Sequence, residues 1–391
     1  MTAARRPVLY VGGGVLQAQA TAELKVLAEL TGAPVTTTLM ALGAFPDSHP
    51  AAPGHARHAR QRRRGDRAAE GRPGFFGARF DDRVTGKLDS FAPYAKIVHA
   101  DIDPAEIGKN RAADVPIVGD AREVIADLVQ AVQKEHGEGH QGDYTAWWSD
   151  LNRWRETYPL GYDLPDDGSL SPQQVIERIG ELAPEGTIFA AGVGQHQMWA
   201  AHFIQYDKPA TWLNSGGAGT MGYAVPAAMG AKAGQPEQTV WAIDGDGCFP
   251  DDQSGADHLR PEQHPDQGRH HQQRRPRDGP PVADPVLQPA LLQHRAAQRT
   301  RRHQPGGPGH AVPDFVKLSE AMGCVGLRCE RPEDLDKVIQ EANSINDRPV
   351  VVDFIVHEDA MVWPMVAAGT SNDEIMAARD VRPDFGDNED D

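Results

Sequence analysis

The chain has 391 residues, enough for two domains that each bury a hydrophobic core. Its net charge of −17 argues against nucleic acid or an anionic membrane as the main partner. Three cysteines without metal-ligand spacing, no apolar run of about 18 residues and no signal-peptide pattern at the N-terminus predict a cytoplasmic α/β protein.

Buried strands alternate with helical stretches over the first 160 residues. An amphipathic helix is expected over 18–30, after the turn Gly12-Gly13-Gly14. Four strands are expected, at residues 7–11, 34–38, 96–100 and 115–118. This alternation predicts a parallel sheet with helices on both faces, in which ligands bind at the carboxyl ends of the strands.

Residues with ligand-binding chemistry follow these strands. Asp101 comes directly after the third strand, where a carboxylate commonly meets a ribose hydroxyl, and Asp120 follows the fourth. The glycine turn at 12–14 suits either nucleotide binding or tight packing. The charged loop 77–83 (GARFDDR) suits a ligand-binding loop and a salt-bridged surface turn equally well.

A second module is expected after a polar helix at 147–154 and a linker at 159–171. Its first helix begins at Ser171-Pro172, with proline at the first helical position. Two buried strands follow, at residues 187–191 and 239–243. The module therefore repeats the strand and helix alternation of the first.

Both of these strands run into motifs suited to a phosphorylated ligand. The first precedes Gly192-Val-Gly-Gln-His196, where the neighbouring glycines favour a ligand contact for the histidine over a structural role. The segment 214–222 is rich enough in glycine to bring backbone close to a ligand, with Met221 as an apolar contact. The second strand precedes Gly245-Asp246-Gly247, whose carboxylate suits Mg²⁺ shared between protein and phosphate.

Gly-Asp-Gly at a strand end resembles one half of the thiamin diphosphate (ThDP) signature, and the protein sequence lacks the other half. An Asn-Asn pair further along the chain would complete the Mg²⁺ site, but the equivalent positions read His270-His271-Gln272-Gln273-Arg274. Shifting a plausible DNA sequence for these residues by one base gives Ile-Ile-Asn-Asn-Gly. The motif is therefore expected in the gene, out of frame.

Two stretches differ from the rest of the chain, from Ala51 to Phe76 and from Pro250 to about Ala311. Both carry net positive charge inside an acidic chain and show no hydrophobic period. The second contains no Ile, Phe, Tyr, Trp, Met, Lys or Asn and is dense in Arg, Gln, His and Pro. These stretches are expected not to fold natively.

Three interpretations of the two stretches compete. A basic disordered arm for nucleic acid lacks any nucleic-acid fold around it, and a metal loop using His270 and His271 lacks supporting carboxylate or cysteine spacing. A shifted reading frame explains both stretches. One base over, 51–60 reads Gln-His-Leu-Gly-Met-Pro-Gly-Met-His-Gly, and 277–283 reads Gly-Met-Val-Arg-Gln-Trp-Gln. We therefore favour frameshifts at about 51–76 and 250–311.

Together these motifs resemble the catalytic (large) subunit of the acetolactate synthase family. The matching motifs are 41–47 (ALGAFPD), 77–83 (GARFDDR), 192–199 (GVGQHQMW) and 362–366 (VWPMV). The resemblance covers 6–50, 77–249 and 312 to about 380. It implies two three-layer α/β domains with parallel sheets: an FAD-associated domain over 1–158 and a ThDP diphosphate-binding domain over 172–375, followed by an acidic tail over 376–391.

The resemblance also assigns cofactor ligands. It implies that FAD is lined by Thr38, Leu39, Met40, Gly77, Ala78, Arg79, Asp81, Arg83, Asp101, Ile102, Asp120 and Ala121. It implies that ThDP is lined by Val193, Gly194, Gln195, His196, Gly219, Met221, Gly245, Gly247 and Cys248. Asp246 is the implied Mg²⁺ ligand.

The family condenses two pyruvates, or pyruvate and 2-oxobutyrate, with loss of CO₂ at the head of branched-chain amino-acid synthesis. It uses ThDP, Mg²⁺ and an FAD without net redox change, and the resemblance implies a homodimer or tetramer with a small regulatory subunit. A different ThDP-dependent 2-oxo acid enzyme (a pyruvate oxidase or decarboxylase) and a non-catalytic FAD-binding remnant are the alternatives. The shifted Gln-Trp-Gln segment argues against the different enzyme.

The chain departs from the family in ways that bear on activity. Family members carry an N-terminal pyrimidine-binding domain whose Glu starts catalysis, and this sequence shows no counterpart, so we assign no catalytic residue. Gln273 stands where the family has an Asn on Mg²⁺. We therefore expect a chain truncated at its N-terminus that has no synthase activity by itself.

Overall fold

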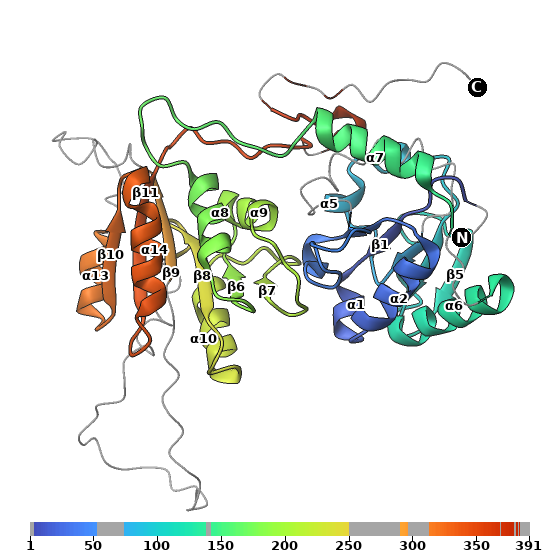
Figure 1. Cartoon of the computed structure of the whole chain (residues 1–391), viewed down its shortest axis with the longest axis horizontal. Helices are drawn as coiled ribbons and strands as arrows, with labels where there is room; N and C mark the ends of the chain where they lie inside the picture. The colour runs from blue at the N-terminus through green and yellow to red at the C-terminus, as the bar shows by residue number, and fades with distance from the viewer. Residues whose placement is uncertain are drawn as a thin grey trace, which may run out of the picture. The chain divides into compact units, whose positions relative to one another are not determined.

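The structure, a computed structural model of the chain, describes residues 4–52, 74–137, 142–249, 313–367 and 369–378, residues 381 and 383, and the backbone of 290–295. These residues form two compact units, one from within 1–163, 201–212 and 361–391, and one from within 164–200 and 213–360 (Figure 1). No helix of the described residues is both long and apolar enough to cross a membrane.

A five-stranded parallel sheet organises the first unit, in the order β2-β1-β3-β4-β5. Its strands are β1 (Leu9–Val11), β2 (Val35–Thr37), β3 (Gly74–Phe76), β4 (Val98–Asp101) and β5 (Val115–Val118). The four strands expected from the sequence are all present. The parallel pairing places their carboxyl ends along one edge of the sheet.

Strand β3 corrects one expectation, because Gly74–Phe76 lies inside the stretch that we expected not to fold. It pairs with β1 on one side and β4 on the other. Backbone N–H and C=O groups supply this pairing whatever the side chains, and the strand position between β1 and β4 would otherwise leave both edges unsatisfied. Phe76 is also fully buried in the core of the unit. Residues 53–73 lie outside the described residues.

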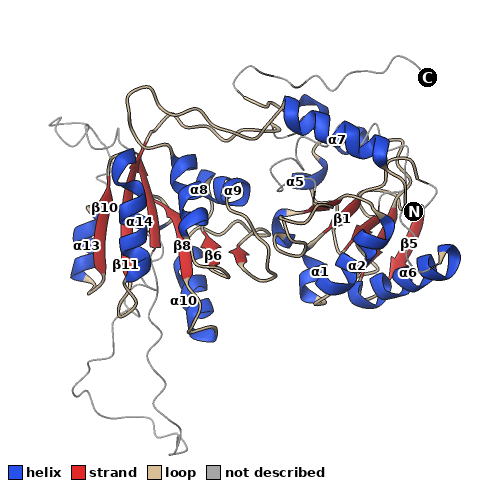
Figure 2. Ribbon diagram, in the orientation of Figure 1, coloured by secondary structure: helices blue, strands red, loops and turns tan. Residues whose placement is uncertain are grey.

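Helices and short 3₁₀ turns complete the first unit, as Figure 2 shows. They are α1 (Gly13–Gln17), α2 (Thr21–Thr31), η1 (Leu39–Ala41), α5 (Asp82–Thr85), η3 (Leu88–Ser90), α6 (Ala121–His136), α7 (Thr145–Thr157) and η7 (Asn372–Glu374). The helix expected over 18–30 is present as α2, and a short helix that was not predicted, α1, precedes it. Gln19 adopts a left-handed φ of 54°, which interrupts the helical backbone between α1 and α2.

The two faces of the first sheet bury different clusters. Leu9 and Val11 pack on one side with Leu24 of α2 and Ile125 of α6. Tyr10, which lies between them in β1, packs on the other side against the cluster that contains Phe80. This alternation is the period of two that a strand buried on both faces requires.

The second unit contains a six-stranded sheet in the order β10-β11-β9-β8-β6-β7, with parallel pairing from β10 through β6. Its strands are β6 (Ile188–Ala191), β7 (Trp212–Asn214), β8 (Val240–Gly245), β9 (Ala290–Arg295), β10 (Val325–Cys329) and β11 (Val350–Val356). Both strands expected from the sequence, β6 and β8, are confirmed.

Strand β9 corrects the same expectation for the second stretch, because Ala290–Arg295 lies inside 250–311. Ala290–Arg295 pairs with β8 and with β11 and so joins the two halves of the sheet. As with β3, main-chain hydrogen bonding is the part of sheet formation that depends least on side-chain identity. Residues 250–289, including His270, His271 and Gln273, lie outside the described residues.

Helices cover both faces of the second sheet. They are α8 (Pro172–Leu182), α9 (Gln195–Phe203), α10 (Ala224–Gly234), α13 (Phe315–Ala321), η6 (Pro332–Asp334) and α14 (Leu335–Ser344). Val240 and Ala242 of β8 share a core with α10 and α13, whereas Trp241 donates a hydrogen bond of 3.1 Å to Asn343 of α14. Alternate residues of β8 therefore face opposite helical layers, and the three-layer α/β fold is confirmed.

Candidate functional site

The carboxyl ends of β6 and β8 meet because the two strands are neighbours in parallel register. Ile188 pairs with Val240, and Ala191 pairs with Ile243. The loop after β6 and the turn after β8 therefore emerge side by side, and the N–H of Gly192 donates a 2.9 Å hydrogen bond to the Ile243 carbonyl. Parallel α/β sheets bind ligands at this edge.

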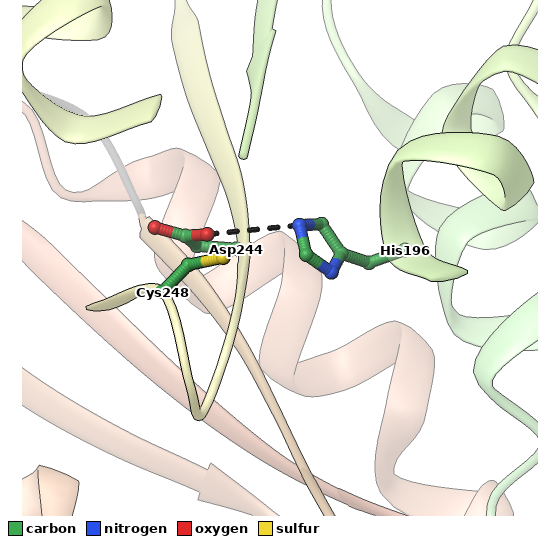
Figure 3. Close-up of side chains that lie close together, drawn as sticks. All are labelled: His196, Asp244 and Cys248. Carbon is green, nitrogen blue, oxygen red and sulfur yellow. Dashed lines mark ion pairs between the residues drawn. The ribbon is translucent and has the colours of Figure 1, made fainter. Parts of the chain in front are cut away.

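Three buried side chains lie together at this edge, as Figure 3 shows. Nε2 of His196, at the start of α9, lies 3.6 Å from Oδ1 of Asp244 on β8. Their ligand atoms and the Cys248 sulfur all lie within 4.8 Å of one another. The Cys248 thiol donates a 3.1 Å hydrogen bond to the carbonyl oxygen of Val193. The β6 loop, the start of α9 and the β8 turn thus form one cluster.

Glycines are required where this cluster is tightest. A Cβ atom added at Gly192 would overlap Oδ1 of Asp244. Atoms added at Gly194 and at Gly245 would each come within 3.1 Å of Nδ1 of His196. Real Cβ atoms are rarely that close to a neighbour, so these positions need glycine, and backbone without side chains lies along this side of the histidine ring.

The ThDP residues expected from the sequence come together in this region. A Cβ atom at Gly247 would lie 3.5 Å from Cε of Met221, and one at Gly219, where φ is +65°, would lie 3.9 Å from Val193. Asp246 is half-buried in the turn directly after β8. Glycine backbone beside a carboxylate on a rigid strand end fits a diphosphate with Mg²⁺.

In the first unit, the residues expected at FAD lie at the carboxyl ends of one sheet. Thr38–Met40 follow β2, Gly77–Arg83 follow β3, Asp101 ends β4 with Ile102 after it, and Asp120 and Ala121 follow β5. A Cβ atom at Gly12 would overlap the Gly77 carbonyl oxygen, so glycine is needed where the β1 turn meets the end of β3.

Several acidic residues of that edge have structural contacts of their own. Asp81 caps α5 by accepting the Arg83 N–H at 3.0 Å, and its other oxygen pairs with Arg79 at 3.2 Å. Asp120 caps α6 by accepting the N–H of Arg122 at 2.9 Å. The salt-bridged turn considered for 77–83 is therefore present, and a ligand role for the same residues remains a prediction.

Known families match both units. The thiamine pyrophosphate enzyme central domain matches residues 1–128, and the C-terminal TPP binding domain matches 192–255 and 290–354. The chain is 54% identical over 400 residues to the acetolactate synthase large subunit of Mycobacterium tuberculosis, covering 99% of this chain and 61% of that protein. It belongs to the acetolactate synthase large-subunit family.

More distant members of the family match over the same span. Identity is 48% to the acetolactate synthase large subunit of Corynebacterium glutamicum, over 98% of this chain and 59% of that protein. It is 35% to the isozyme 3 large subunit of Escherichia coli, over 98% of this chain and 65% of that protein. The chain spans about three fifths of the length of its acetolactate synthase relatives, and the TPP binding domain match supports ThDP as cofactor.

Sequence reasoning missed Asp244, which is fully buried in β8. The sequence favoured Asp246 as the functional carboxylate because it lies between two glycines, Gly245 and Gly247. The signal for Asp244 was present as a carboxylate directly after Trp241-Ala-Ile243, in a strand buried on both faces. Burying a carboxylate costs several kcal/mol unless neighbours compensate, so its place in such a strand indicates a specific role.

Burial sets the charges of the cluster. It lowers the pKa of His196 from 6.5 to about 4, so the ring is neutral at pH 7. Burial, and next the charge of Asp244, raises the pKa of the Cys248 thiol to about 11. A protonated thiol that already donates to a carbonyl is neither a nucleophile nor a ready metal ligand. The cluster is therefore a buried support for the surrounding glycine backbone.

The low pKa of His196 predicts an acid-sensitive second unit. The unfolded chain takes up a proton near pH 6.5 and the folded chain only near pH 4, so stability present above pH 6.5 is lost as the pH falls toward 4. The free energy of unfolding should drop by about 2 kcal/mol between pH 7 and pH 5 from this group. Hydrogen exchange of β6 and β8 peptides, measured at both pH values, reports it.

His196→Gln should remove most of this pH dependence from β6 and β8. The matched control is His99→Gln, because burial also lowers the pKa of His99, in β4 of the first unit. That variant should change the acid response of the first sheet and leave β6 and β8 as they were. An unchanged pH dependence of β6 and β8 in His196→Gln would contradict the assignment.

Proposed function

We propose that this chain supplies the cofactor-binding part of an acetolactate synthase catalytic subunit. The complete enzyme condenses two pyruvates, or pyruvate and 2-oxobutyrate, with loss of CO₂, for valine, leucine and isoleucine synthesis. The observation that carries the proposal is the meeting of the β6 and β8 carboxyl ends, which brings His196, Asp246 and the glycines between them to one edge. The match to acetolactate synthases from three genera selects the reaction within the wider ThDP family.

The second unit would hold ThDP and Mg²⁺ through residues of this edge. The N–H groups of Gly245 and Gly247 suit the diphosphate oxygens, and Asp246 suits the metal, which takes few protein carboxylates and shares phosphate oxygens. Met221, 46% exposed, offers an apolar contact beside Gly247. When bound, ThDP supplies the nucleophile and the electron sink for decarboxylating a 2-oxo acid.

The first unit would hold FAD in a structural role. Large apolar side chains stand exposed at the sheet edge where its ligands are expected: Met40 is 45% exposed and Ile102 is 70% exposed. Exposed apolar surface beside strand-end carboxylates suits a dinucleotide with planar rings and ribose hydroxyls. The same proposal includes a cytoplasmic location, assembly as a homodimer or tetramer, and a small regulatory subunit as partner.

We expect this chain alone to form no acetolactate. Gln273 stands at the family's second Mg²⁺ side-chain ligand, and a longer amide side chain does not reproduce the position of the Asn oxygen. The test is a colorimetric acetolactate assay on purified chain with pyruvate, ThDP, Mg²⁺ and FAD. Measurable acetolactate would contradict the expected inactivity while supporting the reaction, whereas acetaldehyde or acetate would favour a decarboxylase or oxidase.

A further inference from the structure

In the pair formed by Asp244 and His196, one particular ring nitrogen of the histidine faces the carboxylate. The Asp244 side chain has no solvent exposure, and its Oδ1 accepts the N–H of Gly245 at 3.1 Å. The same oxygen lies 3.6 Å from Nε2 of His196. That separation exceeds a hydrogen bond in length, and an approach of about 0.5 Å would bring the two atoms into hydrogen-bond range.

The opposite edge of the imidazole ring faces glycine backbone. Nδ1 and Cε1 lie against Gly194 and Gly245, where added Cβ atoms would stand 3.0–3.2 Å from them. Nε2 is buried and, within the described residues, makes no hydrogen bond of ordinary geometry, although the Gly192 backbone also lies beside the ring. One ring nitrogen of His196 thus meets a buried carboxylate, and the other meets the backbone of the proposed diphosphate site.

We propose that Asp244 is a positioning residue that holds His196 as the Nε2–H tautomer and directs Nδ1 toward Gly194 and Gly245. A carboxylate accepts hydrogen bonds, so it selects the tautomer that donates from Nε2. Nδ1 is then an acceptor at the cofactor site, suited to a backbone N–H or to a water of hydrated Mg²⁺. This inference rests on the proposed function only for the identity of the ligand.

The positioning also accounts for Gly192 and for the burial of the two paired side chains. Only glycine fits at position 192, because a side chain there would occupy the space of the Asp244 carboxylate. Burial keeps the His196 ring neutral, and a neutral ring with one fixed proton has a defined donor side and a defined acceptor side. Orienting the His196 ring is therefore a functional reason for burying the Asp244 carboxylate despite the free-energy cost of its desolvation.

The first test reads the tautomer in the free chain. Two-bond ¹H–¹⁵N correlation of ¹⁵N-histidine-labelled chain distinguishes the two ring nitrogens, and His196→Gln assigns the signal. We expect the Nε2–H tautomer in wild type and a shift toward Nδ1–H in Asp244→Asn, whose amide can donate to Nε2. Nδ1–H in wild type, a measurement that needs no variant at Asp244, would overturn the inference.

The matched control is Asp353→Asn. Asp353 is also buried, on β11 of the same sheet, but it pairs with Arg328 at 2.8 Å. Its loss should lower the stability of the unit and leave the His196 tautomer unchanged. A tautomer shift in Asp353→Asn equal to that in Asp244→Asn would mean that general loosening moves the ring, and the positioning role would be lost.

The second test is a double-mutant cycle on the affinity for ThDP with Mg²⁺, measured by calorimetry. Asp244→Asn and His196→Gln should each weaken binding by about 10-fold, and the double variant should be no weaker than His196→Gln. If the affinity loss of the double variant equals the product of the two single losses, Asp244 acts independently of His196, which would contradict the inference. Absence of ThDP binding in wild type would sink the proposed function, while the tautomer measurement still decides the positioning role.

Discussion

Asp246→Ala is expected to abolish Mg²⁺-dependent ThDP binding by this chain. Mg²⁺ is typically held by one or two carboxylates plus phosphate oxygens, so removing one carboxylate removes a large share of its protein ligands. Changes around a metal ligand already cost about 10–100-fold in affinity, and the loss of a ligand itself should cost at least about 100-fold. The turn that carries Asp246 follows a strand paired on both sides, so the backbone should keep its conformation.

Calorimetric titration of ThDP in the presence and absence of Mg²⁺ measures this effect. The matched control is Glu237→Ala, which removes an exposed carboxylate before the amino end of the same strand, β8. It should bind ThDP as wild type does. Equal loss in both variants would mean that charge in general, and not the carboxylate after β8, supports binding.

Rewriting residues 250–311 in the neighbouring reading frame should have the second large effect. Around His270–Arg274 the rewritten chain reads Ile-Ile-Asn-Asn-Gly, which restores both an apolar strand and the amide ligand expected for Mg²⁺. Burying two isoleucines contributes about 3 kcal/mol or more to the stability of the second unit. The added ligand should tighten ThDP binding by at least about 10-fold.

The control for the rewritten chain keeps its composition and shuffles the order of residues 250–311. Urea unfolding and the same ThDP titration compare the two proteins. The rewritten chain should be the more stable and the tighter binder, because position as well as composition is restored. If the shuffled chain performs equally well, the frameshift interpretation fails, and resequencing the gene across both stretches checks the frame directly.

The strands near the two sites could be predicted because their runs of apolar residues are also the segments buried in the folded protein. Residues 240–243 (VWAI) form an unbroken apolar run, and the structure has β8 over Val240–Gly245. Ser171 was expected to precede a helix starting at proline, and it caps α8 by accepting the N–H of Gln174. A glycine at the end of a strand or a serine at the start of a helix marks the boundary of that element within a short window of sequence.

Other elements could not be predicted because their cause lies far away in the chain. Strand β9 has neither a hydrophobic period nor clean boundaries in sequence, and its place follows from its neighbours β8 and β11. The short helix α1 and the left-handed backbone of Gln19, which separates it from α2, were not predicted, and glutamine seldom adopts that conformation. Such features follow from packing and pairing that no short window of sequence contains.

The site divides in the same way. His196 and Asp246 could be chosen because they lie beside glycines at strand ends. The burial of Asp244 could also have been inferred from its strand, but its pairing with His196 could not, because His196 is 48 positions earlier in the chain. The pair becomes visible only when β6 and β8 are set in register. Asp81 and Asp120 show the reverse limit, since the structure gives them helix-capping contacts that the sequence did not reveal, and their ligand role stays a prediction.

The central claim is that the carboxyl ends of β6 and β8 hold ThDP through a metal ion at Asp246. The most direct test is a crystal of the chain grown with ThDP and Mn²⁺ in place of Mg²⁺, examined by anomalous difference density. We expect a manganese peak at coordination distance from the Asp246 carboxylate, with the diphosphate against Gly245 and Gly247. A peak elsewhere with the cofactor bound, or an empty turn after β8 at saturating ThDP, would contradict it.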